Sequence, residues 1–226
     1  MVNEGMLVNG TVLAMAALIF FNNIRRAERW KKLLPEEALW YVKVFWVLSG
    51  LSVLFMGLRQ FAGYFGYYDT DLLFFYAAGV PGALLMLPII SLVTQLVTGS
   101  QTKALAAGAL LGVAALAGIV LIVQAGAVGP TVTFWGTYYD VNSNDGEVLV
   151  LAAIFLPGLL ASIVLLYYSL TGRIRRELAF FTLSILLIVL ALTFDSLVTT
   201  AWGGVFLLVF RTFILYGALV TFLVHD

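Results

Sequence analysis

The sequence predicts an all-α integral membrane protein, a single bundle of seven transmembrane helices over residues 1–226. Three observations predict it. The chain is 62% hydrophobic and only 11% charged, roughly half the charged fraction of soluble domains. Its apolar residues form seven runs, each close to the roughly 20 residues that cross a bilayer. Basic residues gather in alternate links. We therefore expect a multi-pass protein, in a prokaryotic cytoplasmic membrane, whose main partner is the lipid bilayer.

Short polar or glycine-containing links separate the seven runs and leave no room for a soluble domain. The first run follows an N-terminus without a basic region, so it does not read as a cleaved signal peptide. The predicted spans are residues 5–24, 38–58, 72–97, 104–126, 148–170, 178–200 and 204–224. A re-entrant segment at 72–97 or 104–126 would change the count by one and place both termini on the same side.

The distribution of basic residues orients the predicted bundle. Cytoplasmic links carry an excess of lysine and arginine. The link after 38–58 and the later links on the same side of the membrane contain one basic residue, Arg59. The other links contain nine: Arg25, Arg26, Arg29, Lys31, Lys32, Lys103, Arg173, Arg175 and Arg176. This predicts an N-terminus outside the cell and a C-terminus in the cytoplasm.

Three ionisable side chains fall inside predicted spans, where each costs free energy. Lys43 lies near the cytoplasmic end of 38–58, among Trp40, Tyr41 and Trp46. It is read as a snorkelling anchor within an interfacial aromatic belt, or as a functional residue. Asp195 and Arg211 lie at similar depths in consecutive antiparallel spans, which predicts an ion pair. The pair would be a structural clamp or a ligand- or ion-responsive switch in the outer half. On this reading, Asp195 is the only carboxylate within a span.

Polar and aromatic residues gather at the predicted outer surface. Residues 131–139 are rich in β-prone types, and Asn144-Asp-Gly146 is a turn signal. A hairpin or lid over the outer mouth is therefore expected in the link 127–147. The alternative for the tyrosines is an ordinary interfacial belt. The candidates for ligand binding or switching are Asp195, Arg211, Arg59, Tyr64, Tyr68, Trp135, Trp202 and Thr199.

Prolines and glycines predict bends and close helix packing. A proline removes a backbone donor and bends a transmembrane helix, which is usually structural but also makes hinges and cavities. Gly108 and Gly112 form a GxxxG pattern in 104–126. That pattern allows close packing within the bundle, in a homodimer or against a partner membrane protein. The candidate kink or hinge residues are Gly79, Pro81, Pro88 and Pro157.

The composition excludes several kinds of chemistry. The chain has no cysteine and one histidine, His225, which excludes thiol chemistry, cysteine-ligated metals and sites held by several histidines. The predicted spans hold no cluster of His, Asp and Ser, and we expect no catalytic residues, no metal site and no cofactor. The zero net charge gives no sign of a nucleic-acid partner. The segment from Asp140 to Glu147 resembles the start of a calcium loop, but its glycine is one place late and Leu151 stands where the closing Glu is expected. It is read as a polar turn.

Several loose motifs occur in a familiar order. They are the tryptophan-rich start of 38–58, the aromatic turn after it, Gly129-Pro130 followed by Phe134-Trp135, and Arg175-Arg176. The whole chain resembles the seven-transmembrane N-terminal sensor module of bacterial histidine kinases and diguanylate cyclases. The resemblance implies sensing of a small or apolar signal, or of the membrane state, and a cytoplasmic signalling partner. The sequence departs from that pattern by ending at Asp226, directly after the last predicted span. We therefore expect a sensor module without its output domain, a stand-alone relative, or a resemblance of architecture only. Its architecture is also similar to microbial rhodopsins, but 204–224 lacks the retinal lysine.

Three functions follow as hypotheses. The first is a non-enzymatic sensor or receptor-like module that responds to a ligand or membrane change in its outer half. The second is a small-molecule transporter or channel that uses the bent segment 72–97. The third is an accessory subunit of a larger membrane complex.

Overall fold

The computed structural model describes residues 4–32, 34–171, 181–182, 184–190, 208–209 and 211–216. Most of them are helical, and the described residues of 181–190 and 208–216 belong to helices as well. The elements in chain order are α1 (Glu4–Ala27), the 3-10 helix η1 (Glu28–Lys32), α2 (Glu36–Tyr64), α3 (Tyr68–Ala83), α4 (Met86–Thr98), α5 (Gln101–Ala125), β1 (Ala127–Val132), β2 (Thr137–Val141) and α6 (Asn144–Leu170).

The first five predicted spans are confirmed as long apolar helices. Among the described residues, five helical stretches are long and apolar enough to cross a membrane: Glu4–Lys32, Glu36–Tyr64, Tyr68–Thr98, Gln101–Ala125 and Asn144–Leu170. The chain is thus mostly helical and compatible with a multi-pass membrane protein. Predicted spans 178–200 and 204–224 lie largely outside the described residues, so the count of seven and the sidedness stay predictions.

The link between α2 and α3 is shorter than expected. Gly66, with φ of 76°, ends α2 in a left-handed conformation that glycine adopts without strain. The amide of Tyr67 bonds to the carbonyl of Ala62, and the amide of Gly66 to that of Gly63, which closes the helix as a Schellman motif. Arg59 therefore lies inside α2, and Asp71 lies inside α3. The prediction that Asp195 is the only carboxylate within a span is wrong for this reason.

The predicted bend in segment 72–97 is confirmed as a break between α3 and α4. Pro81 lies in the last turn of α3, and Pro88 lies in the first turn of α4. Proline cannot donate the backbone bond that a continuous helix needs. The hydroxyl of Ser52 on α2 donates to the carbonyl of Ala78 at 3.1 Å, which ties α3 to α2 just before the break. Pro157, by contrast, lies within a continuous α6.

The predicted hairpin is confirmed, but its turn is elsewhere. β1 and β2 pair antiparallel, with Val132 opposite Thr137, and the connecting turn is 133–136. Asn144-Asp-Gly146, predicted as a turn, opens α6 instead. The Ser143 hydroxyl accepts a hydrogen bond from the Gly146 amide at 3.1 Å, and acidic residues in the first helical turn favour a helix start. The calcium-like segment is therefore divided between a strand end and a helix.

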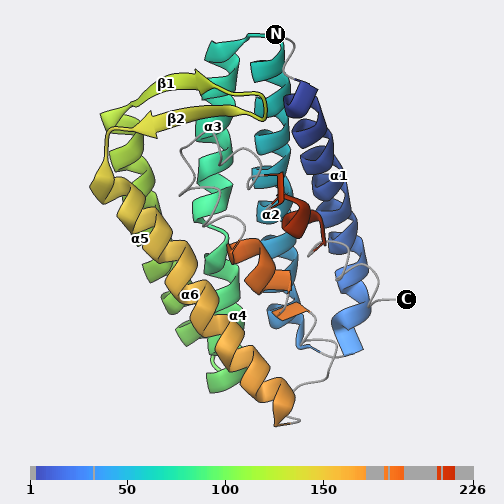
Figure 1. Ribbon diagram of the computed structural model, residues 1–226. Coiled ribbons are helices and arrows are strands. Elements are labelled where there is room, and N and C mark those ends of the chain that lie inside the picture. Colours follow the sequence, from blue (N-terminus) through green and yellow to red (C-terminus); the bar gives the residue numbers. More distant parts are fainter. Residues whose placement is uncertain are drawn as a thin grey trace.

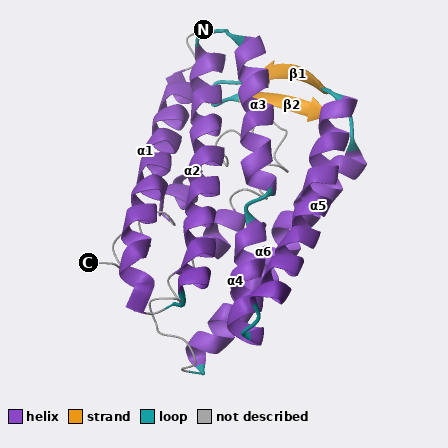
Figure 2. Cartoon of the chain, turned by 180° about the vertical axis from the view of Figure 1, so that it is seen from behind, coloured by secondary structure: helices purple, strands orange, loops and turns teal. Residues whose placement is uncertain are grey.

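The helices form one bundle with the hairpin across one end. Figures 1 and 2 show α1 beside α2, α5 and α6 beside α4, and the hairpin at the end where α1 begins. This end is called the hairpin end below. The GxxxG glycines of α5 pack inside the bundle, since a side chain at Gly108 would overlap the Ser91 hydroxyl of α4 and one at Gly112 would meet Leu87.

An aromatic cluster fills the core in the other half of the bundle. It consists of Phe20, Trp30, Phe45, Trp46 and Phe181, all at most 3% exposed. The Phe181 ring lies 5.3 to 5.7 Å from the rings of Trp30, Trp46 and Phe45. The interfacial belt predicted around Lys43 is therefore wrong for Trp46, which packs inward.

The other residues of that predicted belt divide between core and surface. Tyr41 is buried, whereas Trp40 is exposed. The Lys43 amine pairs with the Glu28 carboxylate of η1, and Lys31 binds the same carboxylate at 2.6 Å. Lys43 thus links α2 to η1.

Candidate ligand cavity

A buried ion pair joins α2 to α3 near the hairpin end. The Nε of Arg59 donates to Asp71 Oδ1 at 3.0 Å. The Arg59 side chain is 12% exposed, and Asp71 is fully buried. A second nitrogen of the guanidinium donates to the backbone carbonyl of Thr137 on β2. One arginine therefore connects two helices and the hairpin.

Tyr139 completes this polar cluster from β2. Its hydroxyl lies 3.1 Å from Asp71 Oδ2 and 3.2 Å from the carbonyl oxygen of Tyr68. Burial and the neighbouring Asp71 carboxylate raise the pKa of Tyr139, so the hydroxyl stays protonated and can donate. Both oxygens of the buried carboxylate thus have a donor, as a charge removed from water requires.

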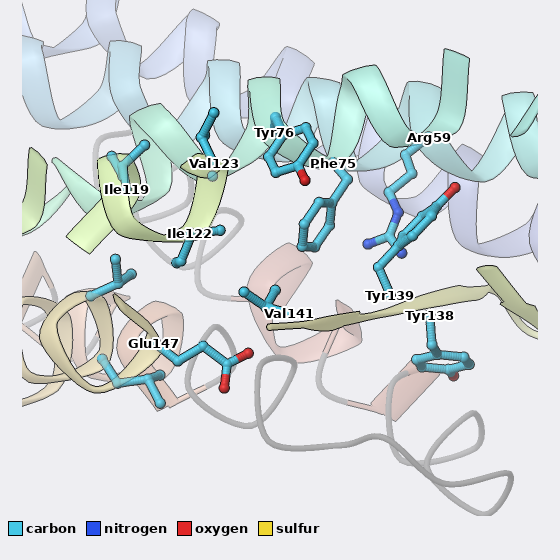
Figure 3. Close-up of a pocket in the computed structure, with 13 residues that line it drawn as sticks. Arg59, Phe75, Tyr76, Ile119, Ile122, Val123, Tyr138, Tyr139, Val141 and Glu147 are labelled. Atoms are coloured by element: carbon cyan, nitrogen blue, oxygen red, sulfur yellow. The ribbon is translucent and has the colours of Figure 1, made fainter. Parts of the chain in front are cut away.

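Aromatic rings flank the guanidinium group. The Arg59 Cζ lies 5.0 Å from the centroid of the Phe75 ring and 5.2 Å from that of Tyr139, within the range of cation–π attraction. Figure 3 shows Arg59 next to the Tyr139 ring, with Phe75 toward the cavity. These four residues, Arg59, Asp71, Phe75 and Tyr139, are called the Arg59 cluster below.

A cavity of about 210 Å³ lies beside the Arg59 cluster. Figure 3 shows it between α3, α5, α6 and β2. Aliphatic side chains of α5 and α6 and aromatic rings of α3 and β2 make up most of the wall. The lining residues are Arg59, Phe75, Tyr76, Gly79, Ile119, Ile122, Val123, Tyr138, Tyr139, Val141, Glu147, Val150 and Leu151. The cavity is thus largely apolar, with polar groups at a few places.

Two polar groups of the lining come from opposite sides. Tyr76 on α3 directs its hydroxyl into the space, and Glu147 extends from the first turn of α6 toward Val141 (Figure 3). Of the described residues in the wall, the charged ones are Arg59 and Glu147. An arrangement of a mostly apolar wall with a few polar groups is typical of small-molecule sites.

A second cavity of about 150 Å³ continues toward the middle of the bundle. It shares Arg59, Phe75, Gly79 and Val150 with the first cavity. It also reaches Gly82, next to the break between α3 and α4. The two spaces therefore follow α3 from the hairpin end to its last turn.

The hairpin is attached to the bundle by polar contacts as well. The Asn9 amide on α1 donates to the Trp135 carbonyl at 2.6 Å. Thr137 and Gln60 are buried where β2 meets α2. Neither the oxygen nor the nitrogen of the Gln60 side-chain amide has a hydrogen-bond partner among the described residues, and buried polar atoms of this kind are usually satisfied by ordered water. Polar side chains of α1 and α2 thus lie against the tip of the hairpin.

The structure brings some predicted site residues together and leaves others apart. Arg59 lies at the centre of the cluster, and Gly79 lines both cavities. Tyr68 contributes its backbone carbonyl, and Trp135 binds α1 through its own. Tyr64 packs on Phe65 in the α2–α3 turn and lines neither cavity.

The predicted pair cannot be placed from the described residues. Arg211 is described and is 3% exposed. Asp195, Thr199 and Trp202 lie outside the described residues. The ion pair between Asp195 and Arg211 therefore stays a prediction.

Sequence reasoning missed Asp71, Phe75, Tyr76, Tyr139 and Glu147 as site residues. The pairing of Asp71 with Arg59 could have been predicted from the sequence, because these opposite charges flank a short turn between antiparallel helices. Tyr139 stood within the β-prone segment, but its partner could not be known without the fold. Comparison with known proteins adds no assignment: no family model matches the sequence, and no curated protein matches it.

Proposed function

We propose that the chain is a non-enzymatic, membrane-embedded sensor or receptor-like module whose ligand site is the cavity beside the Arg59 cluster. The observation that carries the proposal is the cavity of about 210 Å³ with its largely apolar wall. An apolar cavity of about 150 Å³ is enough to bind benzene. The space therefore suits a small ligand with an apolar body.

The Arg59 cluster supplies the responding element. It joins α2, α3 and the hairpin through one guanidinium group, and its Phe75 and Tyr139 rings also form cavity wall. A ligand that contacts these rings changes the packing around the charge. A ligand shifts a conformational equilibrium only by binding one state more tightly than the other. The break after Ala83 lets α3 move without carrying α4 with it.

The orientation of the bundle in the membrane is taken from the distribution of basic residues among the links. With the N-terminus outside, the hairpin end faces the exterior of a prokaryotic cell. The end that holds Glu28, Lys31 and Lys43 then faces the cytoplasm, where a signalling partner would read the change.

Filling the cavity tests this proposal. A Cβ at Gly79 meets no atom within 4 Å, so Gly79→Leu should fold and occupy the space. We expect small apolar amphiphiles to raise the melting temperature of the wild type but not of Gly79→Leu. Val80→Leu, at the next position and outside both linings, is the control. Hydrogen exchange at 28–32 should change with ligand in the wild type. If every stabilising compound acts equally on Gly79→Leu, the cavity is not the site.

A transporter is the second candidate, favoured by the broken helix. Interrupted helices beside a cavity are characteristic of transporters, and the second cavity reaches Gly82 at the break. Reconstituted liposomes distinguish the two functions. Uptake of a compound that binds the wild type, and loss of that uptake in Gly79→Leu, would favour transport. An accessory subunit would instead retain a stable partner in mild detergent.

A further inference from the structure

The charge of the cavity wall identifies the class of ligand. Arg59 and Asp71 neutralise each other at 3.0 Å. Glu147 also lines the space, and its side chain forms no hydrogen bond or ion pair with a described residue. Among the described residues, the wall together with Asp71 therefore carries a net negative charge, which a cationic ligand would balance.

The aromatic wall favours the same sign of charge. The faces of aromatic rings attract cations, and quaternary and primary ammonium groups are bound in this way. Phe75 and Tyr139 already flank Arg59. Tyr76 and Tyr138 are further lining rings, and the Tyr76 hydroxyl points into the space (Figure 3).

We propose that the cavity binds a small organic cation, an ammonium group on an aromatic or branched aliphatic body. This inference rests on the proposed function of the cavity and adds the chemistry of its ligand. The ammonium group lies between Glu147 and Tyr76. The apolar body packs on the aliphatic wall formed by α5 and α6, at Ile119, Ile122 and Val150.

Ligands of other charge fit the wall less well. An anion would approach the Glu147 carboxylate and meet a guanidinium group whose charge Asp71 balances. A neutral ligand would gain no charge–charge attraction from the Glu147 carboxylate, which lines the space and is exposed to water. A cation gains that attraction while its body fills the apolar part.

Three probes of equal size and different charge test the proposal. They are 2-phenylethylammonium, 2-phenylethanol and phenylacetate, each added to the full chain in mild detergent at neutral pH. Binding is measured by isothermal titration calorimetry and by the shift in melting temperature. We expect the ammonium compound to bind at least about tenfold more tightly than the alcohol, and phenylacetate to bind least.

The first turn of α6 offers a matched pair of variants. Glu147 and Asp145 are both acidic residues of that turn, but Asp145 does not line the cavity. Glu147→Gln should lower the affinity for 2-phenylethylammonium about tenfold and leave that for 2-phenylethanol unchanged. Asp145→Asn should leave both unchanged. Glu147→Asp keeps the charge and should keep the preference for the cation.

The outcomes separate this inference from the proposed function. Equal or tighter binding of the alcohol or of phenylacetate to the wild type overturns the assignment of a cation. So does a Glu147→Gln variant that keeps the full preference, or a wild type that binds none of the three probes. If Gly79→Leu still blocks other amphiphiles in those cases, the cavity remains a binding site. If Gly79→Leu blocks nothing, the proposed function fails as well.

Discussion

The two halves of the bundle use aromatic residues in opposite ways. Away from the hairpin, the rings of Phe20, Trp30, Phe45, Trp46 and Phe181 pack on one another and are all but completely buried. At the hairpin end, Phe75 and Tyr139 pack on a guanidinium group and border a cavity of about 210 Å³. Close packing resists change, whereas an unfilled space beside a charge pair can accept a ligand. This difference in packing is why we propose the hairpin end, and not the aromatic cluster, as the part that responds to a ligand.

Removing the buried carboxylate should have the largest effect on stability. Asp71→Asn removes the carboxylate that pairs with Arg59 at 3.0 Å in a buried site. Breaking one partner of a buried ion pair costs about 3–5 kcal/mol. We expect a loss of about 4 kcal/mol in the free energy of unfolding, measured by chemical denaturation in detergent.

Asp69 provides the control for that substitution. It is exposed and lies in the same first turn of α3, so Asp69→Asn should cost less than about 0.5 kcal/mol. Equal losses for the two variants would mean that the buried pair does not stabilise the hairpin end.

Truncating a ring of the aromatic cluster away from the hairpin should lower the free energy of unfolding by slightly less. The Phe45 ring lies 4.9 Å from that of Trp46 and 5.7 Å from that of Phe181. Phe45→Ala should lower the free energy of unfolding by about 3 kcal/mol, because it leaves a cavity among close-packed rings. Because the proposed signal reaches residues 28–32 beside this cluster, Phe45→Ala should also change the affinity of a ligand at the hairpin end. Phe65→Ala, on an exposed ring, is the control; an unchanged affinity in Phe45→Ala would show that the two halves are not coupled.

Removing one hydroxyl tests the hydrogen bond within the Arg59 cluster. Tyr139→Phe keeps the ring against Arg59 but removes the donor to Asp71, 3.1 Å away. A hydrogen bond to a charged group contributes about 1.5–3 kcal/mol, so a loss of about 1.5 kcal/mol is expected. The exposed Tyr67 gives the control Tyr67→Phe. If Tyr139→Phe loses no stability, the hydroxyl does not stabilise the fold and only the packing of the ring does.

The same hydroxyl predicts a smaller effect at high pH. In the folded protein, burial is the main cause and the Asp71 carboxylate the second cause of the raised pKa of Tyr139. A tyrosine of the unfolded chain ionises at about pH 10. Above that pH the unfolded state binds fewer protons, so the stability that Tyr139 contributes is present below about pH 10 and is lost as the pH rises. Between about pH 10 and 11, the wild type should lose about 1 kcal/mol more than Tyr139→Phe. Parallel pH profiles would contradict the raised pKa.

The sequence predicted the helices better than it predicted where they end. Apolar runs mark the hydrocarbon-spanning part of a helix but do not limit its length. The extension of α2 to Tyr64 depends on the turn at Gly66, and it moves Arg59 and Asp71 from a link into facing helices. The break near Pro81 and the hairpin near residue 131 were predictable because proline and β-prone residues act locally.

The cavity could not be predicted in the same way. Its wall combines Tyr76 of α3, Ile119 of α5, Tyr139 of β2 and Glu147 of α6. Their meeting depends on the relative rotation of elements far apart in the chain, which hydropathy does not encode. Glu147 in particular reads as an ordinary acidic residue at a helix start.

An experimental density map of the full chain with 2-phenylethylammonium tests the central claim most directly. The account predicts density for the compound in the cavity between Tyr76 and Glu147, with its amine near the carboxylate and its ring against Ile119 and Ile122. Density for the compound elsewhere, with this cavity empty or filled by the protein's own side chains, would contradict it.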